Sequence, residues 1–293
     1  MKVLVTGAKG QLGYDVINEL KKRSHEAVGV DIVEMDITDE ISVRTVIDTV
    51  KPDAVIHCAA WTAVDAAEDC PEKVHAVNAT GTQYIANICK ELECRMMYIS
   101  TDYVFDGQGE KPWEADCKEY QPLNVYGQSK LAGELAVANT LTDYYIVRIA
   151  WVFGLNGNNF IKTMLGVGKK FDTLRVVNDQ IGTPTYTYHL ARLLVDMIET
   201  EKYGYYHATN EGGYISWYEF ACEIFRQATE IGHTEYASDR LKVHAVTTKE
   251  YGLSKAKRPF NSRLDKSKLV ENGFAPLPDW KEALNHYLRT IDF

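Results

Sequence analysis

Basic residues are outnumbered in this 293-residue chain, which has 32 Lys and Arg against 41 Asp and Glu and a net charge of −9. Proteins that bind nucleic acids use clustered Lys and Arg to neutralise phosphates. The charge balance therefore argues against a nucleic acid as the main partner. It does not exclude a small anionic ligand, which a few cations and backbone amides can hold.

Long apolar runs and metal-ligand patterns are also missing. No hydrophobic stretch approaches the roughly 20 residues of a membrane helix, and the chain opens on a strand-like segment instead of a signal peptide. The six cysteines show neither Cys-x-x-Cys nor a Cys/His spacing for zinc. We therefore expect a cytoplasmic protein with reduced thiols, no structural zinc and no association with a membrane.

Strand-like apolar runs alternate with helical patterns along the chain. With 45% hydrophobic and 25% charged residues, the composition is typical of a globular protein with one large or two modest domains. Expected strands cover about 2–6, 27–31, 54–58, 95–101, 144–152 and 205–208, with a short one near 176–177; expected helices cover about 14–22, 41–50, 71–93, 159–170 and 187–200. This alternation predicts a parallel sheet with right-handed crossovers. The proline-containing tail predicts a smaller, less regular domain.

A glycine-rich turn follows the first expected strand. Residues 2–6 lead into Gly7-Ala8-Lys9-Gly10-Gln11-Leu12-Gly13, and helical spacing begins at Tyr14. Glycines at such a turn let a pyrophosphate approach the helix N-terminus. The spacing G-x-x-G-x-x-G differs from the usual fingerprint, and an ordinary βα turn is the alternative. A second expected strand ends at Asp31, where a carboxylate would bind the adenosine ribose hydroxyls, so the two features together predict a dinucleotide site.

Two further segments carry groups suited to reducing a carbonyl. Tyr98–Asp102 is expected to end a strand with the hydroxyls of Ser100 and Thr101, and Tyr126-Gly127-Gln128-Ser129-Lys130 begins a helical pattern. Residues four apart share a helix face, so Tyr126 and Lys130 would point into the same space. An adjacent ammonium lowers the phenol pKa from about 10. Such a pair, with a hydroxyl to hold the carbonyl oxygen, is what a carbonyl reductase needs.

The same Tyr-Gly-x-Ser-Lys pattern recurs at Tyr251–Lys255. A chain rich in Tyr and Lys is expected to contain such a pair by chance. Pro259 blocks a continuing helix after this second pair, and no strand end with hydroxyls precedes it. We therefore assign the chemistry to Tyr126 and expect Tyr251 on the surface or in a loop.

These motifs resemble those of the extended short-chain dehydrogenase/reductase superfamily and, more narrowly, of the dTDP-4-dehydrorhamnose reductase family. The resemblance runs nearly end to end and includes residues 7–13, 58–65, 100–107, 126–134, 158–160, 179–185 and 258–265. It implies an α/β fold, in which a Rossmann-type doubly wound parallel sheet is joined to a smaller α/β substrate-binding domain. We expect residues 1–156 plus about 184–210 to form the dinucleotide-binding domain. Residues about 157–183 plus 211–293 would form the substrate-binding domain.

The resemblance implies reduction of the C4 ketone of dTDP-4-dehydro-L-rhamnose to dTDP-L-rhamnose, for surface polysaccharide, with a nucleotide-sugar as substrate. Tyr126 would donate the proton, Lys130 would hold the nicotinamide ribose, and Thr101 would orient the ketone. The carboxylate of Asp31 favours NADH, whereas Lys9 would offset the extra phosphate of NADPH, so we expect NADPH or NADH as cofactor. The resemblance leaves a homodimer open.

Further contacts are implied by the resemblance alone. Cofactor contacts are expected at Gly7, Gly10, Gln11, Leu12, Gly13, Asp31, Asp36, Ile37, Ala59, Ala60, Trp61, Thr62, Tyr126 and Lys130, and substrate contacts at Val64, Thr101, Asp102 and Trp151. Plain structural roles are the alternatives: capping of a turn or helix for Asp36, Thr101 and Asp102, and core packing for Val64 and Trp151. Asn78, within an expected helix, would support a proton relay or only satisfy backbone groups.

The chain departs from the family pattern in three places. Trp61 stands where His or Tyr is more usual, the stretch 30–36 is short, and Asp15 replaces a Glu that in some relatives contributes to a metal site at a dimer interface. A scattered carboxylate is usually solvated, so we predict no bound metal.

Two other functions remain alternatives. One is another nucleotide-sugar reductase, epimerase or dehydratase on the same scaffold, and the other is a non-catalytic NAD(P)-binding regulatory subunit. The related dehydratases follow the catalytic Thr with Asp-Glu. Here Tyr103 follows Thr101-Asp102, which favours simple reduction, and the intact set of Thr101, Tyr126 and Lys130 argues against a non-catalytic subunit.

Overall fold

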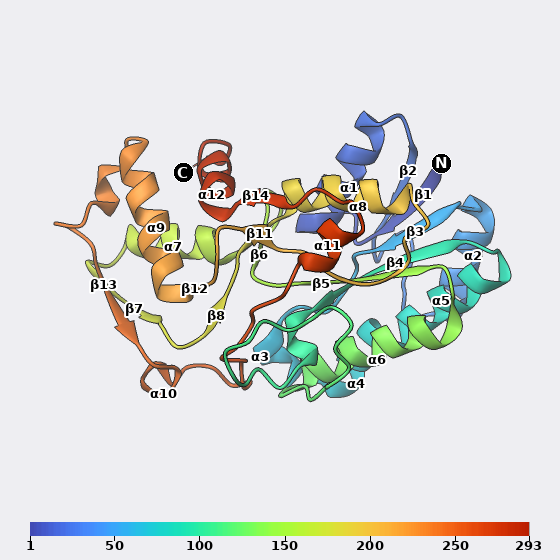
Figure 1. Ribbon diagram of the computed structural model, residues 1–293, viewed down its shortest axis with the longest axis horizontal. Helices are drawn as coiled ribbons and strands as arrows, with labels where there is room; N and C mark the ends of the chain where they lie inside the picture. Colours follow the sequence, from blue (N-terminus) through green and yellow to red (C-terminus); the bar gives the residue numbers. More distant parts are fainter. Residues whose placement is uncertain (293) are drawn as a thin grey trace.

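A six-stranded parallel sheet forms the centre of the computed structural model, which describes residues 1–292 (Figure 1). The strand order is β10-β5-β4-β3-β1-β2. The strands are β1 (Lys2–Thr6), β2 (Glu26–Val30), β3 (Ala54–His57), β4 (Arg95–Thr101), β5 (Tyr144–Ile149) and β10 (Gly204–His207). The chain places β2 on one side of β1 and β3 on the other. In such sheets ligands bind at the carboxyl ends of the strands where the order reverses.

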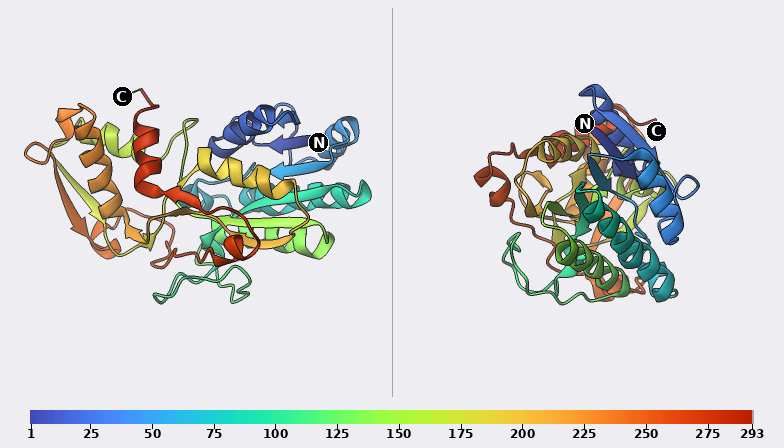
Figure 2. Two further views of the ribbon diagram at one scale, coloured as in Figure 1. Left: turned by 45° about the horizontal axis from the view of Figure 1, so that its top comes forward. Right: turned by 90° about the vertical axis from the view of Figure 1, so that its right-hand side faces the viewer.

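Helices cover both faces of this sheet (Figure 2). One face packs against α1 (Gln11–Lys22) and α8 (Thr187–Ile198), through Val3, Val5 and Ile56 of the strands. The other face packs against α2 (Glu40–Val50), α5 (Gly81–Glu91) and α6 (Val125–Thr140). Strands buried on both faces carry near-continuous apolar runs, which is why they were recognisable in the sequence. The predicted α/β fold with a doubly wound parallel sheet is confirmed.

Two expected elements are interrupted in the structure. The helix expected over 71–93 consists of α4 (Pro71–His75), a π-helical turn η1 (Ala76–Thr80) and α5. The strand expected over 144–152 ends at Ile149, because Trp151 adopts a left-handed backbone conformation with φ of 51°, and a short strand β6 (Val152–Phe153) follows. π-Helical turns and left-handed backbone at a bulky residue are both concentrated at functional sites.

A second hydrophobic core lies at the opposite end of the molecule from β2 and α2 (Figure 1). Its helices are α7 (Phe160–Gly168), α9 (Trp217–Glu230) and α12 (Trp280–Leu288). Four two-stranded pairs accompany them: β6 with β9 (Thr185–Tyr186), β7 (Thr173–Val177) with β13 (Lys242–Val246), β8 (Ile181–Gly182) with β12 (Ile215–Ser216), and β11 (Asn210–Glu211) with β14 (Leu277–Asp279). The sequence indicated a smaller irregular region here but not α9, α12 or most of the short strands.

Short helical segments complete the chain: α3 (Val64–Ala67), η2 (Asp102–Val104), η3 (Thr234–Tyr236), α10 (Thr248–Tyr251) and α11 (Ser267–Glu271). Leu269, Phe274 and Leu277 belong to the core beneath α1 and α8, although in sequence they lie between α9 and α12 of the second core. The domain boundaries given above therefore stay a prediction.

Within residues 1–292, no helix is long and apolar enough to cross a membrane. The six cysteines are free thiols. Asp15 is buried in α1 and accepts a hydrogen bond of 2.5 Å from the Thr187 hydroxyl. Among the described residues, no group of three or more His, Cys, Asp or Glu side chains is placed to hold a metal ion.

Candidate active site

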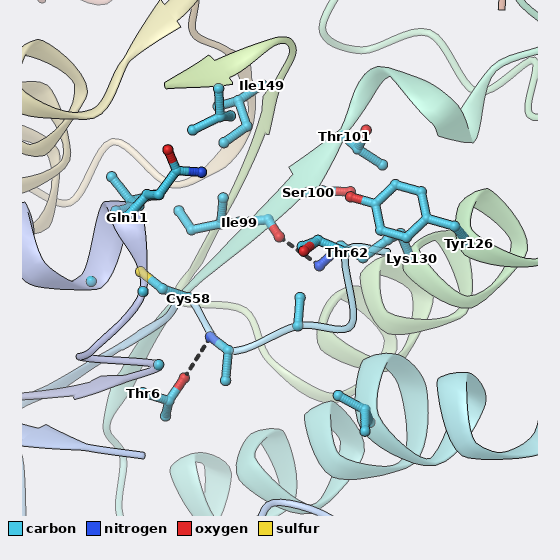
Figure 3. Close-up of a pocket in the computed structure, with 18 of the residues that line it drawn as sticks. Thr6, Gln11, Cys58, Thr62, Ile99, Ser100, Thr101, Tyr126, Lys130 and Ile149 are labelled. Carbon is cyan, nitrogen blue, oxygen red and sulfur yellow. Dashed lines mark hydrogen bonds between the residues drawn. The ribbon is translucent and has the colours of Figure 1, made fainter. Parts of the chain in front are cut away.

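A cavity of about 850 Å³ runs along the carboxyl ends of the central strands (Figure 3). Thr6, Val30, Ile99 and Ile149 line it at the ends of β1, β2, β4 and β5, and Cys58 follows β3. Because parallel strands all end at the same edge of a sheet, groups far apart in sequence meet here. Every residue predicted to contact cofactor or substrate lines this cavity, with the single exception of Trp61.

The glycine loop fits a pyrophosphate. Gly7 has a φ of +64°, and a Cβ there would lie 2.8 Å from the amide nitrogen of Ala59. A Cβ on Gly13 would overlap the Gly7 carbonyl oxygen. Gly10 caps α1 without any side-chain hydrogen bond, so the first amides of α1 are free of capping side chains. An uncapped helix N-terminus with close backbone approach favours a bound anion.

Asp31 lies at the predicted ribose end of the cavity. Its Oδ2 accepts a hydrogen bond of 3.1 Å from the backbone amide of Lys9, and its Oδ1 accepts one of 3.0 Å from the amide of Ile32. The Lys9 ammonium lies 3.1 Å from Glu34 Oε1. The carboxylate thus joins the glycine loop to the turn after β2, and sequence analysis did not identify Glu34 as part of this arrangement.

Asp36 and Ile37 also line the cavity. Asp36 accepts hydrogen bonds from the Thr38 amide (2.9 Å) and hydroxyl (2.7 Å), which lower the pKa of its carboxyl. Ile37 is buried in the core beneath α2 and α5. Asp36 therefore closes a turn with Thr38, whereas the residue that caps α2 is Asp39. The contact of Asp36 with the adenine stays a prediction.

The π-helical turn holds the loop after β3 in place. Asn78 Oδ1 accepts from the Trp61 amide at 2.7 Å, and its Nδ2 donates to the Trp61 carbonyl at 3.1 Å and to Ser129 Oγ at 2.9 Å. Ala59, Ala60, Thr62 and Val64 of this loop line the cavity. The Trp61 indole donates to the Ala63 carbonyl and lies outside the cavity lining. A cofactor contact by Trp61 stays a prediction that rests on its backbone.

Tyr126, Thr101 and Lys130 converge at the other end of the cavity (Figure 3). Tyr126 and Lys130 lie on the first turns of α6, which begins after the Asn124 side chain accepts from the Gly127 amide. Lys130 Nζ donates to the Ile99 carbonyl at 2.7 Å and lies 4.0 Å from the centre of the Tyr98 ring.

The pKa of Tyr126 next to Lys130 differs from the expectation. Burial lowers the pKa of Lys130 to about 7, against the opposing effect of the Glu134 charge. Burial raises the pKa of Tyr126, and a hydrogen bond with Thr101 only partly offsets it. The expected lowering of the Tyr126 pKa by Lys130 is not found in this structure, because burial is the largest influence on the Tyr126 pKa and raises it.

Thr101 and Asp102 line the cavity and are hydrogen-bonded to each other. Thr101 Oγ1 donates to Asp102 Oδ1 at 2.9 Å and accepts from the Tyr103 amide at 3.2 Å, which caps η2. Burial raises the pKa of Asp102 to about 6, although the nearby Ser262 hydroxyl lowers it. Asp102 Oδ2 and Ser100 Oγ make no hydrogen bond that satisfies the usual geometry. Buried polar atoms are normally satisfied by a hydrogen-bond partner, so each of these two atoms has the capacity for one.

An aromatic wall closes the cavity next to these groups. Trp151 stacks on Trp217, with ring centres 3.7 Å apart and planes at 14°, and both line the cavity. Trp217, which begins α9 far along the chain, was not predicted from the sequence. The pattern Ser216-x-x-Glu219 forms a capping box at that helix start, and it is a local signal that could have identified α9.

The second Tyr-x-x-x-Lys pair lies outside this site. Tyr251 is the last residue of α10, and Gly252 follows in the left-handed region. Lys255 forms an ion pair with Asp69. Tyr251 and Lys255 therefore do not share a helix face, and neither lines the cavity.

Comparisons with known proteins agree with this geometry. The family described as "RmlD substrate binding domain" matches residues 1–293. A protein of Aggregatibacter actinomycetemcomitans named dTDP-4-dehydrorhamnose reductase is 40% identical over 294 residues, covering 97% of each chain. The spore coat polysaccharide biosynthesis protein SpsK of Bacillus subtilis (strain 168) is 39% identical over 288 residues, covering 98% of this chain and 97% of the relative.

A solved structure shows the same likeness in three dimensions. The dTDP-4-dehydrorhamnose reductase of Bacillus anthracis, crystallised in complex with NADP, superposes with a TM-score of 0.91 at 38% identity. The superposition covers 99% of this chain and 100% of that one. The likeness therefore extends over both the parallel sheet and the second core.

Proposed function

The chain belongs to the RmlD substrate-binding domain family, and from that membership we propose that it is an NAD(P)H-dependent dTDP-4-dehydrorhamnose reductase. It would reduce the C4 ketone of dTDP-4-dehydro-L-rhamnose to the alcohol of dTDP-L-rhamnose, a precursor for surface polysaccharide. One observation carries the proposal: Thr101, Tyr126 and Lys130 meet at one end of a cavity whose other end is a glycine loop built for a dinucleotide. Full-length relatives at about 40% identity support it.

The cofactor would lie along the carboxyl ends of β1 and β2. The uncapped N-terminus of α1 would hold the pyrophosphate, and Asp31 would face the adenosine ribose. The space that a Cβ on Gly7 or Gly13 would fill is what such a backbone approach requires. Bound NAD(P)H supplies the hydride that reduces the C4 carbon.

The residues of the chain supply the proton and the orientation. The Tyr126 hydroxyl would donate its proton to the ketone oxygen, which receives negative charge as the carbonyl is reduced. Its raised pKa keeps that proton in place until the oxygen becomes basic. Thr101 would orient the ketone oxygen, and Lys130, whose ammonium approaches the cavity from the Ile99 carbonyl, would hold the nicotinamide ribose.

The sugar would occupy the space between Asp102 and the aromatic wall. Asp102 Oδ2 and Ser100 Oγ are available for sugar hydroxyls, and Val64, Trp151 and Trp217 provide apolar surface. A deoxysugar presents both polar edges and an apolar methyl group, which suits such a mixed lining.

The test is a panel of dTDP-, UDP- and GDP-linked 4-keto sugars with the purified protein, using NAD(P)H absorbance as the readout. We expect stoichiometric oxidation of NAD(P)H with dTDP-4-dehydro-L-rhamnose and formation of dTDP-L-rhamnose. Epimerases and dehydratases recycle their cofactor, so turnover of sugar without net oxidation would replace the reductase with one of them. Absence of NAD(P)H consumption together with a stable complex with another enzyme would favour a regulatory subunit.

The proposal also covers the cellular compartment and the oligomeric state. The cytoplasm is the proposed compartment, since free thiols are typical of a reducing environment. A homodimer is the proposed assembly, and light scattering of the purified protein would give its mass in solution.

A further inference from the structure

The turn after β2 closes a ring of polar contacts with the glycine loop. The Lys9 amide donates to Asp31 Oδ2 at 3.1 Å, the Asp31 amide donates to Glu34 Oε2 at 3.0 Å, and the Lys9 ammonium lies 3.1 Å from Glu34 Oε1. Lys9 and Asp31 both line the cavity, whereas Glu34 does not. Glu34 is therefore placed to act on the ligand site only through its neighbours.

Lys9 is the cation that this ring brings to the ribose end of the site. The phosphate that distinguishes NADPH from NADH lies on the adenosine ribose, next to the carboxylate that binds the ribose hydroxyls. Asp31 repels that phosphate, so a nearby cation decides whether NADPH is accepted. In this structure the ammonium of Lys9 is already paired with Glu34.

We propose that Glu34 is a specificity-determining residue that lowers the preference for NADPH by holding the Lys9 ammonium away from the 2′-phosphate. NADH does not need this cation, so its binding leaves the pair intact. NADPH must separate Lys9 from Glu34 before it gains the contact. This inference rests on the cofactor part of the proposed function.

The pair is open enough for this competition. The Lys9 and Glu34 side chains are 66% and 44% exposed, so water and salt screen their attraction. A dianionic phosphate is a stronger partner for an ammonium than one carboxylate is. The pair therefore tunes the choice between the cofactors without excluding either one.

The test uses two nucleotides that differ only in the phosphate at issue: 2′,5′-ADP and 5′-AMP. Their affinities are measured by calorimetry, without substrate or turnover. We expect Glu34→Gln to raise the affinity for 2′,5′-ADP relative to 5′-AMP by about two- to fivefold at low salt, which corresponds to the strength of an exposed ion pair. The gain should shrink at high salt, because screening already weakens the pair.

Two further variants separate the mechanism from a general charge effect. Glu26→Gln removes an exposed carboxylate at the other end of β2, where Glu26 pairs with Lys2, and should leave the ratio unchanged. In a Lys9→Gln background, Glu34→Gln should give no gain. A gain of full size in that background would show simple repulsion by Glu34 and would overturn the inference.

Failure of the inference is distinguishable from failure of the proposed function. If the wild-type protein binds 5′-AMP and NADH but Glu34→Gln leaves the affinity ratio unchanged, the role of Glu34 is wrong and the dinucleotide site stands. If neither NADH nor NADPH binds the wild-type protein, the proposed function itself is wrong.

Discussion

The Tyr126 hydroxyl, the proposed proton donor, lies in an environment that keeps it protonated. Burial raises its pKa, and only Thr101 contributes in the opposite direction as a hydrogen-bond partner. A donor of this kind is effective only when the accepting oxygen becomes strongly basic, as the oxygen of a carbonyl does during reduction. The cavity thus favours proton transfer that is coupled to hydride transfer over proton loss to water.

The first prediction concerns loss of the Tyr126 hydroxyl. Tyr126→Phe keeps the ring and its packing but loses the hydroxyl, so kcat should fall by about 10²–10⁴-fold, the range of a lost general acid. The cofactor affinity should stay nearly unchanged. Tyr251→Phe is the matched control, because that tyrosine lies outside the cavity. Steady-state kinetics that showed the reverse order of effects would contradict the assignment of the chemistry to Tyr126.

A second prediction concerns the buried carboxyl of Asp102, whose pKa is raised from 3.8 to about 6. The folded protein binds this proton more tightly than the unfolded chain does, so Asp102 destabilises the fold increasingly as the pH rises from about 4 to 6. Above that pH range the destabilisation of the fold by Asp102 has its full size, and below it the destabilisation is absent. Asp102→Asn should therefore stabilise the fold at pH 7.5, by about 1–3 kcal/mol, and much less at pH 4.

Thermal unfolding at the two pH values checks this sign. Asn keeps an oxygen that accepts from the Thr101 hydroxyl, so the cap of η2 survives the substitution. Asp172→Asn, at an exposed position, is the control and should change stability little at either pH. Equal effects of Asp102→Asn at pH 4 and pH 7.5 would mean that the carboxyl does not titrate as described.

At the scale of single residues, the sequence identified side chains that belong to motifs. Thr101, Tyr126, Lys130 and the glycine loop all lie where their spacing placed them relative to strands and helices. Trp217 and Glu34 were not identified, since their importance comes from a stacking contact and an ion pair across the fold. The raised pKa of Tyr126 was also missed, because spacing gives proximity to Lys130 but not the degree of desolvation.

At the scale of elements, a buried ion pair fastens α6 to the sheet. The Arg148 guanidinium on β5 makes two hydrogen bonds to Glu134, of 2.8 and 2.7 Å, and both side chains are fully buried. Arg148 also donates to the Ala115 carbonyl and the Tyr120 hydroxyl. The pair therefore fixes the helix that carries Tyr126 and the loop that follows η2.

The third prediction concerns loss of the buried ion pair between Arg148 and Glu134. Glu134→Gln leaves the guanidinium buried without a counter-charge, and the free energy of unfolding should fall by about 3–5 kcal/mol. The exposed pair of Arg226 and Glu230 on α9 offers the contrast, since Glu230→Gln should cost no more than about 1 kcal/mol. Urea unfolding of the two variants measures both. Similar losses would mean that burial of the Glu134 pair has little energetic weight.

The buried central strands were predictable, and elements that depend on tertiary contacts were not. Strands β1, β3, β4 and β5 carry near-continuous apolar runs because helices cover both faces of the sheet. The π-helical turn at Asn78 and the left-handed Trp151 have no periodic pattern. They are held by tertiary contacts: hydrogen bonds between Asn78 and the Trp61 backbone, and stacking of Trp151 on Trp217. No local preference of the sequence encodes such contacts.

At the scale of the whole molecule, alternation of strands and helices was enough to predict the parallel sheet and its covering helices. The second core was only indicated as an irregular region. Its short strands pair segments that are distant in sequence, such as β7 with β13, and two-residue strands leave no period to recognise. The return of Leu269, Phe274 and Leu277 to the first core depends on the same long-range packing.

The last prediction follows from the way the cavity draws on both cores. The glycine loop belongs to the sheet, whereas Trp217 packs against the second core, so ligands along the cavity bind only when both parts are folded. NADPH at 100 times its Kd should then add about 2.7 kcal/mol to the stability of a single unfolding transition, a shift of roughly 5–10 °C in Tm. dTDP-L-rhamnose, as a probe that carries the sugar, should add a further shift, and Trp217→Ala should reduce that second shift while leaving the NADPH shift intact. Calorimetry could instead resolve two unfolding transitions, of which both ligands shift only one. That result would show that the two cores unfold independently and that the cavity does not join them.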